Sequence, residues 1–364
     1  RQMCIRDRDG DNDLLVSTTD KPSNGLYYFE NKGNNLFAPG KRIAEGQRKL
    51  SVSWPGGKLT VCTPGRVYPD FINSLFDQPE KIRYKQEFYS GRANQWKFAD
   101  FDGDGIFDLL IGVSDWRDYG WDNAYNSRGE WTHGPLHGYV YWIKNKGSNE
   151  KPVYGKAQQV MAGKKPVDVY GKPSPNLIDW DNDGDLDLIC GEFLDKITFF
   201  ENTGTRTQPE YTGGRFLEVN GQTLHLELEM PEVVVYDWDN DQDYDIIVGM
   251  EDGRVVFIEN TGHGKDGKPV LAEPVYFKQQ AEYVKCGALS TPCSYDWDGD
   301  GDEDIISGNT AGFIEYIENL GGNDHPVWAA PQRLKAGDSV FRIMAGRNMS
   351  IQGPAEAKWG YTVP

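Results

Sequence analysis

The chain has 364 residues and a formal net charge of −18. Such an acidic surface excludes recognition of nucleic acid through a basic face and disfavours anionic membranes. No stretch approaches the roughly 20 consecutive apolar residues of a membrane-spanning helix, so no membrane insertion is expected. The 42 Gly and 20 Pro predict many turns, and therefore an all-β chain rather than a helix bundle.

An acidic motif, here called the ladder, recurs five times along the chain. Its full form reads Asp179-Trp-Asp-Asn-Asp-Gly-Asp-Leu-Asp187, with Asp at positions 1, 3, 5 and 9. Ladders two to five span residues 100–108, 179–187, 237–245 and 296–304, and a degenerate ladder one at 5–13 has Ile5 at position 1. A short apolar segment rich in β-formers follows each ladder, which predicts a strand there.

A second motif, here called the landmark, ends each of these hairpins. It reads Phe200-Glu-Asn-Thr-Gly204 in repeat three and has a related form in the other four repeats. In repeats three, four and five its Asn lies 15 residues after the last ladder Asp, and successive ladders are 58 or 59 residues apart. Two insertions interrupt this regularity, at about 38–95 and 115–138. The first is expected to add strands or a lid.

Each repeat has room for three or four antiparallel strands, whose exposed faces need neighbouring sheets. Stacking such sheets around an axis gives a β-propeller. The ladders and the Glu-Asn-Thr-Gly turns resemble those of bacterial VCBS or FG-GAP-like repeat proteins, which are related to the integrin α-subunit propeller. The integrin Phe-Gly and Gly-Ala-Pro cores are mostly missing, so integrin-like ligand recognition is not implied.

The resemblance implies a propeller of seven blades. The chain supplies five ladder-bearing repeats and the start of a sixth, within a single domain over 9–364. Residues 1–8 have no counterpart before the other ladders, and we expect a non-native or degenerate leader there. Trp180, Trp238 and Trp297 recur at ladder position 2, where Phe101 stands in ladder two, and are expected to pack between blades.

Carboxylates at alternating positions of a tight loop are suited to Ca²⁺, which prefers six to eight oxygen ligands. We predict up to one structural Ca²⁺ per ladder, because a staple of the fold would recur in every blade. Position 7 is expected to act through its backbone carbonyl. The alternative is a set of solvated acidic turns. The predicted ligands are Asp7, Asp9, Asp13, Asp100, Asp102, Asp104, Asp108, Asp179, Asp181, Asp183, Asp187, Asp237, Asp239, Asp241, Asp245, Asp296, Asp298, Asp300 and Asp304.

The 115–138 insertion is the most unusual segment, because it concentrates aromatic residues with two of the five His. Exposed aromatic faces stack on sugar rings, which suggests a glycan groove; burial of the same rings would instead indicate a local apolar plug. Both interpretations stay open from sequence. The candidate ligand-binding residues are Trp116, Tyr119, Trp121, Tyr125, Trp131, His133 and His137.

The sequence therefore favours a non-catalytic binding module for a polysaccharide, another glycan or a surface protein. One alternative is a carbohydrate-active enzyme, a lyase or hydrolase, with His133, His137, Tyr125, Tyr139, Arg117 or Arg128 supplying the chemistry. Another is a structural scaffold within a larger surface protein. A monomer located outside the cell, on its surface or in the periplasm is expected from the family resemblance and from the abundance of calcium there.

The five Cys are irregularly spaced, so the one disulfide that the sequence leaves open is a bridge between Cys286 and Cys293.

Overall fold

The structure, a computed structural model, describes residues 2–6, 12–19, 24–33, 36–85, 87–89, 94–120, 124–264, 268–279, 287–344 and 353–364. It divides into two compact units, each described by itself. Unit 1 comprises Arg1–Tyr119, Gly134–Gly249 and Val255–Gln279, and unit 2 comprises Gly120–His133, Met250–Arg254 and Gln280–Pro364. No helix in the described ranges combines the length and apolarity needed to cross a membrane.

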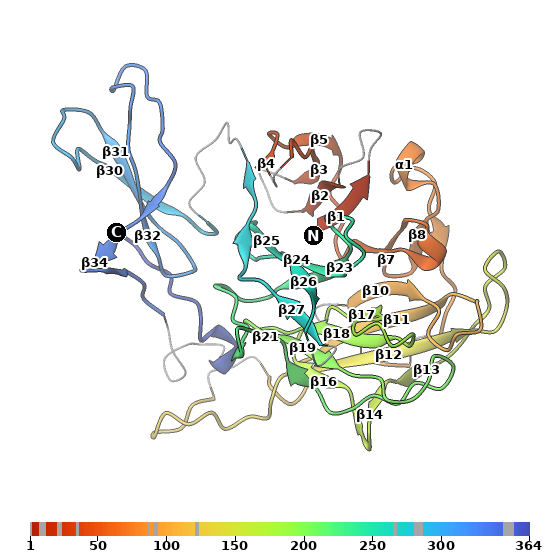
Figure 1. Cartoon of the computed structure of the whole chain (residues 1–364). Coiled ribbons are helices and arrows are strands. Elements are labelled where there is room, and N and C mark those ends of the chain that lie inside the picture. Colours follow the sequence, from red (N-terminus) through yellow and green to blue (C-terminus); the bar gives the residue numbers. More distant parts are fainter. Residues whose placement is uncertain are drawn as a thin grey trace. The chain divides into compact units, whose positions relative to one another are not determined.

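Antiparallel sheets with four strands in sequence order are the repeating element of unit 1 (Figure 1). The first is β1 (Gln2–Arg6), β2 (Asn12–Thr18), β3 (Gly25–Phe29) and β5 (Lys41–Ala44); the next is β6 (Ser51–Ser53), β7 (Thr60–Thr63), β8 (Arg66–Tyr68) and β9 (Glu80–Lys81). The third is β10 (Asn94–Ala99), β11 (Asp108–Asp115), β12 (His137–Asn145) and β13 (Tyr154–Gln159), with β16 (Asp168–Tyr170) also on β12. The last two are β17 (Asn176–Ile178), β18 (Asp187–Gly191), β19 (Ile197–Phe200) and β20 (Arg215–Phe216), then β23 (Glu232–Tyr236), β24 (Asp245–Gly249), β25 (Val255–Ile258) and β28 (Val275–Tyr276).

Smaller elements join these sheets. They are β4 (Leu36–Phe37) with β29 (Lys278–Gln279), β14 (Met161–Ala162) with β15 (Lys165–Pro166), a sheet of β22 (Gln222–Thr223), β21 (Glu218–Val219), β27 (Pro269–Leu271) and β26 (Asn260–His263), the short helix α1 (Phe71–Ser74) and the 3₁₀ turn Pro55–Gly57. Unit 2 holds the four-stranded sheet β30 (Thr291–Tyr295), β31 (Asp304–Gly308), β32 (Ile314–Ile317) and β33 (Gln332–Arg333), the hairpin β34 (Lys335–Ala336) and β35 (Ser339–Val340), and the 3₁₀ turn Gly353–Glu356.

The strands predicted after the ladders are confirmed as β2, β11, β18, β24 and β31. Each of these is the second strand of its sheet, so ladders two to five are the turns that enter it from the first strand. The third strand then leads into the landmark. The early insertion is confirmed as added strands, since it contributes the sheet β6–β9, which carries no ladder.

Buried clusters connect the five sheets of unit 1 in a cyclic order. Leu15 packs with Val61 between the first two sheets, and Cys62 packs with Trp96 between the second and third. Leu110 then packs with Leu188, strands β17 and β18 contact β23, and Leu14 packs with Ile247, which returns to the first sheet. Sheets packed face to face in a ring confirm the all-β propeller class. The number of blades in a whole propeller of this type stays a prediction.

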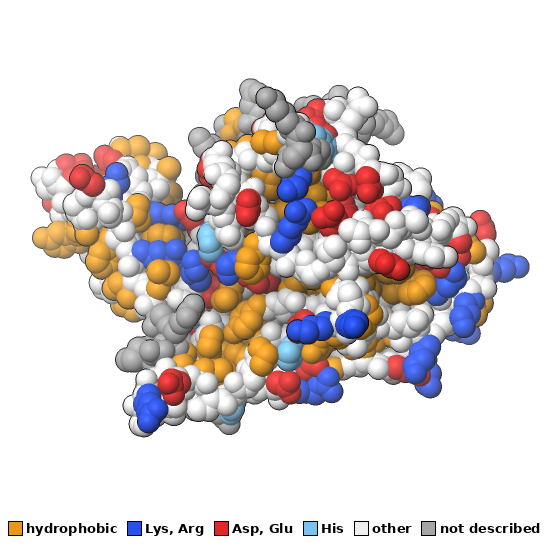
Figure 2. Space-filling view, turned by 60° about the horizontal axis from the view of Figure 1, so that its bottom comes forward, with side chains coloured by type: hydrophobic (Ala, Val, Ile, Leu, Met, Phe, Trp, Pro, Cys, Tyr) orange, Lys and Arg blue, Asp and Glu red, His pale blue; other side chains and the backbone are white. Residues whose placement is uncertain are grey.

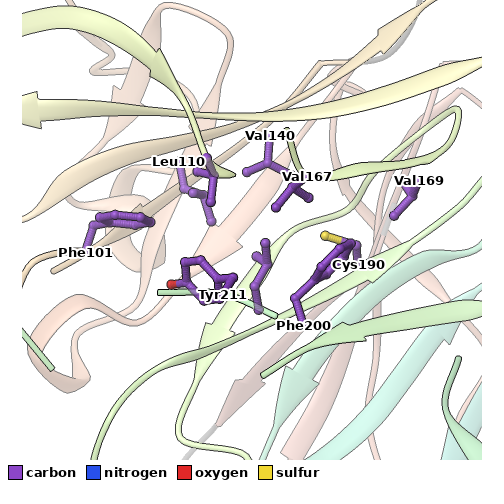
Figure 3. Close-up of a cluster of buried hydrophobic side chains, with 10 residues drawn as sticks. Phe101, Leu110, Val140, Val167, Val169, Cys190, Phe200 and Tyr211 are labelled. Carbon is purple, nitrogen blue, oxygen red and sulfur yellow. The ribbon is translucent and has the colours of Figure 1, made fainter. Parts of the chain in front are cut away.

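The core between the third and fourth sheets shows how a ladder serves this packing. Phe101, at position 2 of ladder two, stacks on Trp142 with ring centroids 4.6 Å apart. Phe101 also lies near the buried Tyr211 (Figure 3). Val140 of β12 and Cys190 of β18 complete the contact from the two sheets. Burying such apolar side chains stabilises the fold by roughly 1.5–3 kcal/mol each.

The packing role predicted for ladder position 2 holds in two further repeats and is wrong in one. Trp180 and Trp238 are buried, and Trp238 packs with Phe37 of β4. Trp297 is instead 51% exposed. The reason is local: in the described part of unit 2, β30–β33 is the one four-stranded sheet, so no second four-stranded sheet of that unit packs against the ring.

The three cysteines whose side chains the structure describes form no bridge. Cys62 and Cys190 are buried thiols, and Cys293 is an exposed free thiol. The possible partner of Cys293, Cys286, lies outside the described residues. The proposed bridge therefore stays a prediction.

Candidate metal centres and binding surface

Four ladders bring three carboxylates together. In each, one oxygen from every member of the group lies within 4.8 Å of the others. The groups are Asp100, Asp102 and Asp104; Asp179, Asp181 and Asp183; Asp237, Asp239 and Asp245; and Asp296, Asp298 and Asp300. Figure 2 shows acidic side chains gathered into compact groups on the surface. Of the predicted ligands in ladder one only Asp13 is described, since Asp7 and Asp9 lie outside the described residues.

The loop wraps because its own carboxylates bind its backbone. In ladder three the N–H of Gly184 donates to Asp179 Oδ2 over 3.2 Å, and the N–H of Asp185 donates to Asp183 Oδ1 over 3.0 Å. The same pair of contacts occurs in ladders two and five. Gly184 has a φ of 94°, and Gln242 has a φ of 81° in ladder four. The positive φ predicted at position 6 is thus confirmed, even where the residue is not glycine.

The last ladder Asp is buried and links the ladder to the landmark. Asp187 Oδ1 accepts the N–H of Asn202 over 2.8 Å, and its Oδ2 accepts the N–H of Trp180 over 3.2 Å. Asp245 and Asp304 accept the equivalent pair of N–H groups. This contact explains the constant 15-residue spacing between the two motifs.

Several carboxylate oxygens in the ladders are buried without a hydrogen-bond partner. They include Oδ1 of Asp100 and Asp102, of Asp179 and Asp181, and of Asp237. A buried acceptor left unsatisfied costs on the order of 1–3 kcal/mol, so such oxygens are rare in native folds. Hard cations such as Ca²⁺ satisfy this kind of all-oxygen set. In ladders three and four, where no described lysine or arginine pairs with these carboxylates, the donor set therefore fits the predicted ion.

Position 7 adds a carboxylate that the sequence analysis did not select. Asp185 is buried, and its Oδ1 also has no hydrogen-bond partner. Burial, and then the charges of Asp183, Asp181 and Asp179, raise the pKa of Asp185 to about 6. The sequence carries this signal, because position 7 is Asp in four of the five ladders. Ile106 at the same position of ladder two favoured a backbone carbonyl as the ligand instead.

The crowding also acts on the last ladder position. Burial raises the pKa of Asp187 to about 7, against the opposing effect of the hydrogen bonds from Asn202 and Trp180. Burial likewise raises the pKa of Asp245 to about 7. A bound divalent cation would favour the ionised forms of these groups.

Ladder two differs from the others in its surroundings. Lys144 Nζ contacts Asp102 Oδ2 and lies 3.0 Å from Asp104 Oδ2. Arg206 Nη2 lies 3.0 Å from Asp100 Oδ2. All three carboxylates of this group therefore have a protein cation beside them.

Two of the candidate ligand-binding residues, Trp116 and Tyr119, lie in the core. The prediction that they form part of a glycan groove is therefore wrong for these two residues. Trp116 is 3% exposed and Tyr119 is 1% exposed. Their rings pack edge to face on each other, and Trp116 packs in the same way on Phe193. The physical reason is that the start of the insertion continues from the buried strand β11 and supplies apolar volume to the sheet beside it. Neither ring presents a face to a sugar.

The middle of the insertion belongs to unit 2. Tyr125 and Trp131 form a β-bridge, and their rings lie edge to face with centroids 5.3 Å apart. His133 is exposed, and its ring lies 5.3 Å from that of Trp131. Trp131 also lies against Gly353, where a Cβ would come within 2.5 Å of the ring. Trp121 lies outside the described residues.

The end of the insertion forms a polar and aromatic surface in unit 1, here called the β12 face. It consists of His137, Tyr139 and Tyr141 on alternate positions of β12, with Arg117 and Asp168 at its edges. The rings of His137 and Tyr139 stack with centroids 5.2 Å apart and planes 12° apart. His137 Nδ1 lies 2.6 Å from Asp168 Oδ2.

The β12 face is held in place from two sides. Arg117 makes a two-pronged contact with the buried Asp115, and its guanidinium lies 5.1 Å from the centre of the Tyr89 ring. His137 Nε2 lies 3.3 Å from Asp118 Oδ2. Of the candidate ligand-binding residues, only His137 contributes to this surface, together with Tyr139 and Arg117, which the sequence named for the enzyme alternative. Tyr141 and Asp168 were missed, although the alternation of His137, Tyr139 and Tyr141 is visible in the sequence.

No protein-family model matches the chain, and no curated protein matches it. Three solved structures of the NanB sialidase from Streptococcus pneumoniae are similar at low levels. A complex with a chlorobenzyl-ammonio-ethanesulfonate is 10% identical with a TM-score of 0.26, a complex with Optactamide is 11% identical at 0.27, and a point mutant is 12% identical at 0.27. Each alignment covers 90% of this chain and 47% of the sialidase chain, so the chain spans about half the length of these structures.

Proposed function

We propose that the chain is a calcium-stabilised propeller that acts as a non-catalytic binding module for a glycan. The observation that carries the calcium part is the set of buried ladder oxygens without hydrogen-bond partners in Asp179, Asp181 and Asp237. Each lies in a loop that is already closed by its own hydrogen bonds, so binding needs little rearrangement. When bound, Ca²⁺ would neutralise the crowded carboxylates, and the ladder residues would hold it.

Calcium titration with thermal unfolding tests this part. An ion that binds only the folded state stabilises it by about 2.7 kcal/mol per site at a concentration of 100 times its dissociation constant. We therefore expect a large rise in Tm with CaCl₂, several ions per chain, and reversal by a chelator. An unchanged Tm would contradict the assignment. Titration with MgCl₂ is the matched control, and a smaller rise is expected there because Mg²⁺ demands stricter octahedral geometry.

The β12 face is the surface that we propose for the glycan. Sugar rings pack their C–H faces on aromatic rings, and carboxylate, guanidinium and imidazole groups hydrogen-bond their hydroxyls. The rings of Tyr139 and Tyr141 are partly exposed here, and Arg117 and Asp168 supply the polar partners. Binding sites gather where repeats differ on a shared scaffold, and Arg117 and His137 of this face lie in the insertion that the other repeats lack.

Tyr139→Ala is the direct test of the glycan part. Loss of a stacking ring should weaken binding to the polysaccharides retained on a glycan array at least tenfold, or about 1.4 kcal/mol. Trp131→Ala serves as the matched control, because Trp131 belongs to unit 2 and should leave binding unchanged. Equal affinities of the native protein and Tyr139→Ala would remove the β12 face from the site.

A carbohydrate-active enzyme is the second candidate, favoured by one observation. His137 is paired with Asp168 over 2.6 Å beside the hydroxyl-bearing Tyr139, which is a base and its positioning carboxylate next to a second proton donor. A lyase would use such a pair to remove and return protons. Assays for new reducing ends and for unsaturated products separate this activity from binding alone. If neither product forms, the enzyme is contradicted and the non-catalytic binding module is retained.

The proposed location is outside the cell, at its surface or in the periplasm. Calcium is abundant in these compartments, and the family resemblance points to the same place. If no glycan on the array binds the protein, a surface-protein ligand or a purely structural role becomes the better interpretation. The predicted monomer is checked by light scattering.

A further inference from the structure

Ladder two carries a charge reversal at a position that the other repeats keep acidic. The residue before the landmark Asn is Glu in four repeats but Lys144 in repeat two. Ladder two also lacks the carboxylate at position 7, where Ile106 stands. Both changes lower the negative charge around the same loop. Two substitutions in one direction at one site indicate a different way of balancing its carboxylates.

The geometry shows where the new cation lies. Lys144 is on β12, which pairs with β11, the strand that ladder two enters. From there its Nζ contacts Asp102 and lies 3.0 Å from Asp104 Oδ2, and these contacts raise the pKa of Lys144. One ammonium group therefore bridges two of the three carboxylates that a metal ion would bridge.

A second cation covers the third carboxylate. Arg206, from the turn after β19 in the next repeat, lies 3.0 Å from Asp100 Oδ2 and donates to the Asp100 carbonyl over 2.7 Å. Its carbonyl oxygen also lies against Gly103, where a Cβ would come within 2.9 Å of it. The turn of repeat three is thus packed directly onto ladder two.

Ladder three provides the contrast. It has the same loop, but Glu201 stands in place of Lys144 and acts as a further negative charge on Asp181. Asp185 adds a buried carboxylate at position 7. Among the described ion pairs, Asp179, Asp181 and Asp183 have no lysine or arginine partner. Glu201 itself pairs with Arg215 over 3.4 Å, but no described lysine or arginine pairs with the three ladder carboxylates. Ladder three therefore holds one more carboxylate than ladder two and has no protein cation beside that group.

We propose that ladder two takes up no calcium, and that Lys144 and Arg206 stabilise its carboxylates in place of a metal ion. The inference rests on the proposed function, since it assumes that the other ladders bind calcium. Calcium entering ladder two would have to displace an ammonium and meet a guanidinium beside it. One oxygen each of Asp100 and Asp102 still has no hydrogen-bond partner, so Lys144 supplies charge balance rather than a full ligand set.

The test counts the calcium ions bound to the full chain by equilibrium dialysis with metal analysis. Asp179→Asn should lower the number by one, and the matched variant Asp100→Asn should leave it unchanged. Loss of one ion in both variants would overturn the inference. No calcium bound to the native protein would instead contradict the proposed function, which keeps the two failures distinct.

The reciprocal charge swap gives an answer even where an Asn variant folds poorly. Lys144→Glu restores the residue of the other repeats, and we expect it to bind one ion more than the native protein. Glu201→Lys brings the ammonium into ladder three and should bind one ion fewer. An unchanged number of ions in Lys144→Glu contradicts the role given to Lys144.

Discussion

Ladder two and ladder three form the same loop under opposite electrostatic conditions. Both begin and end with Asp, both have a glycine with positive φ at position 6, and both end in a buried carboxylate that accepts the landmark N–H. Lys144 and Arg206 pair with the carboxylates of ladder two, whereas ladder three has Glu201 in the place of Lys144 and a further carboxylate, Asp185, at its own position 7. The loop is therefore set by its hydrogen bonds, and its partner cation is set by residues outside the motif.

The largest expected effect tests what the two ladders share. Asp187→Ala leaves two buried N–H groups without an acceptor, and Asp108→Ala removes the acceptor of the Asn145 N–H and of Trp142 Nε1–H. Each lost partner costs about 1–3 kcal/mol, so we expect a loss of about 3 kcal/mol in either variant. Urea unfolding in excess calcium measures it. A loss confined to Asp187→Ala would mean that position 9 stabilises through a metal ion and not through these hydrogen bonds.

The pH dependence of the calcium-free protein is the next largest effect. Because burial raises the pKa of Asp187 to about 7, the folded state holds this proton more strongly than the unfolded state. That contribution is fully present below about pH 4 and is lost as pH rises through about 7. Thermal unfolding in chelator should show the loss.

The matched variants for the pH effect come from the two ladders. Asp187→Asn cannot ionise and should flatten this part of the curve. Asp104→Asn should not, because burial, which raises the pKa of Asp104, is outweighed by the combined hydrogen bonds from Lys144 and the Ile106 N–H and the charge of Lys144, which lower it. The same slope in both variants would show that the burial of Asp187 does not control the effect.

The smallest effect concerns the protein cation itself. Lys144→Met removes a partly exposed ion pair, which contributes about 1 kcal/mol or less. In chelator we expect the Tm of Lys144→Met to lie slightly below that of the native protein. The rise in Tm on adding calcium should be larger for the variant than for the native protein. Lys146→Met, an exposed neighbour, is the control. A calcium response unchanged from the native protein would show that Lys144 does not exclude the ion.

The sequence by itself determined the features that local chemistry controls. The ladder turn, its positive φ at position 6, the strand after it and the spacing to the landmark all follow from hydrogen bonds within one hairpin. These bonds require Asp and Asn at fixed positions, so they are readable as a motif. The all-β class and the oxygen-rich candidate metal centres follow from the same repetition.

Only the tertiary structure decided which side chains are buried and which charges meet. Trp116 is an insertion aromatic like the others in sequence, yet it lies in the core because β11 carries it there. Asp168 reaches His137 only because β16 pairs with β12. Lys144 reaches Asp102 across 42 residues of sequence. Such contacts depend on how distant strands pack, and no pattern along a single strand records them.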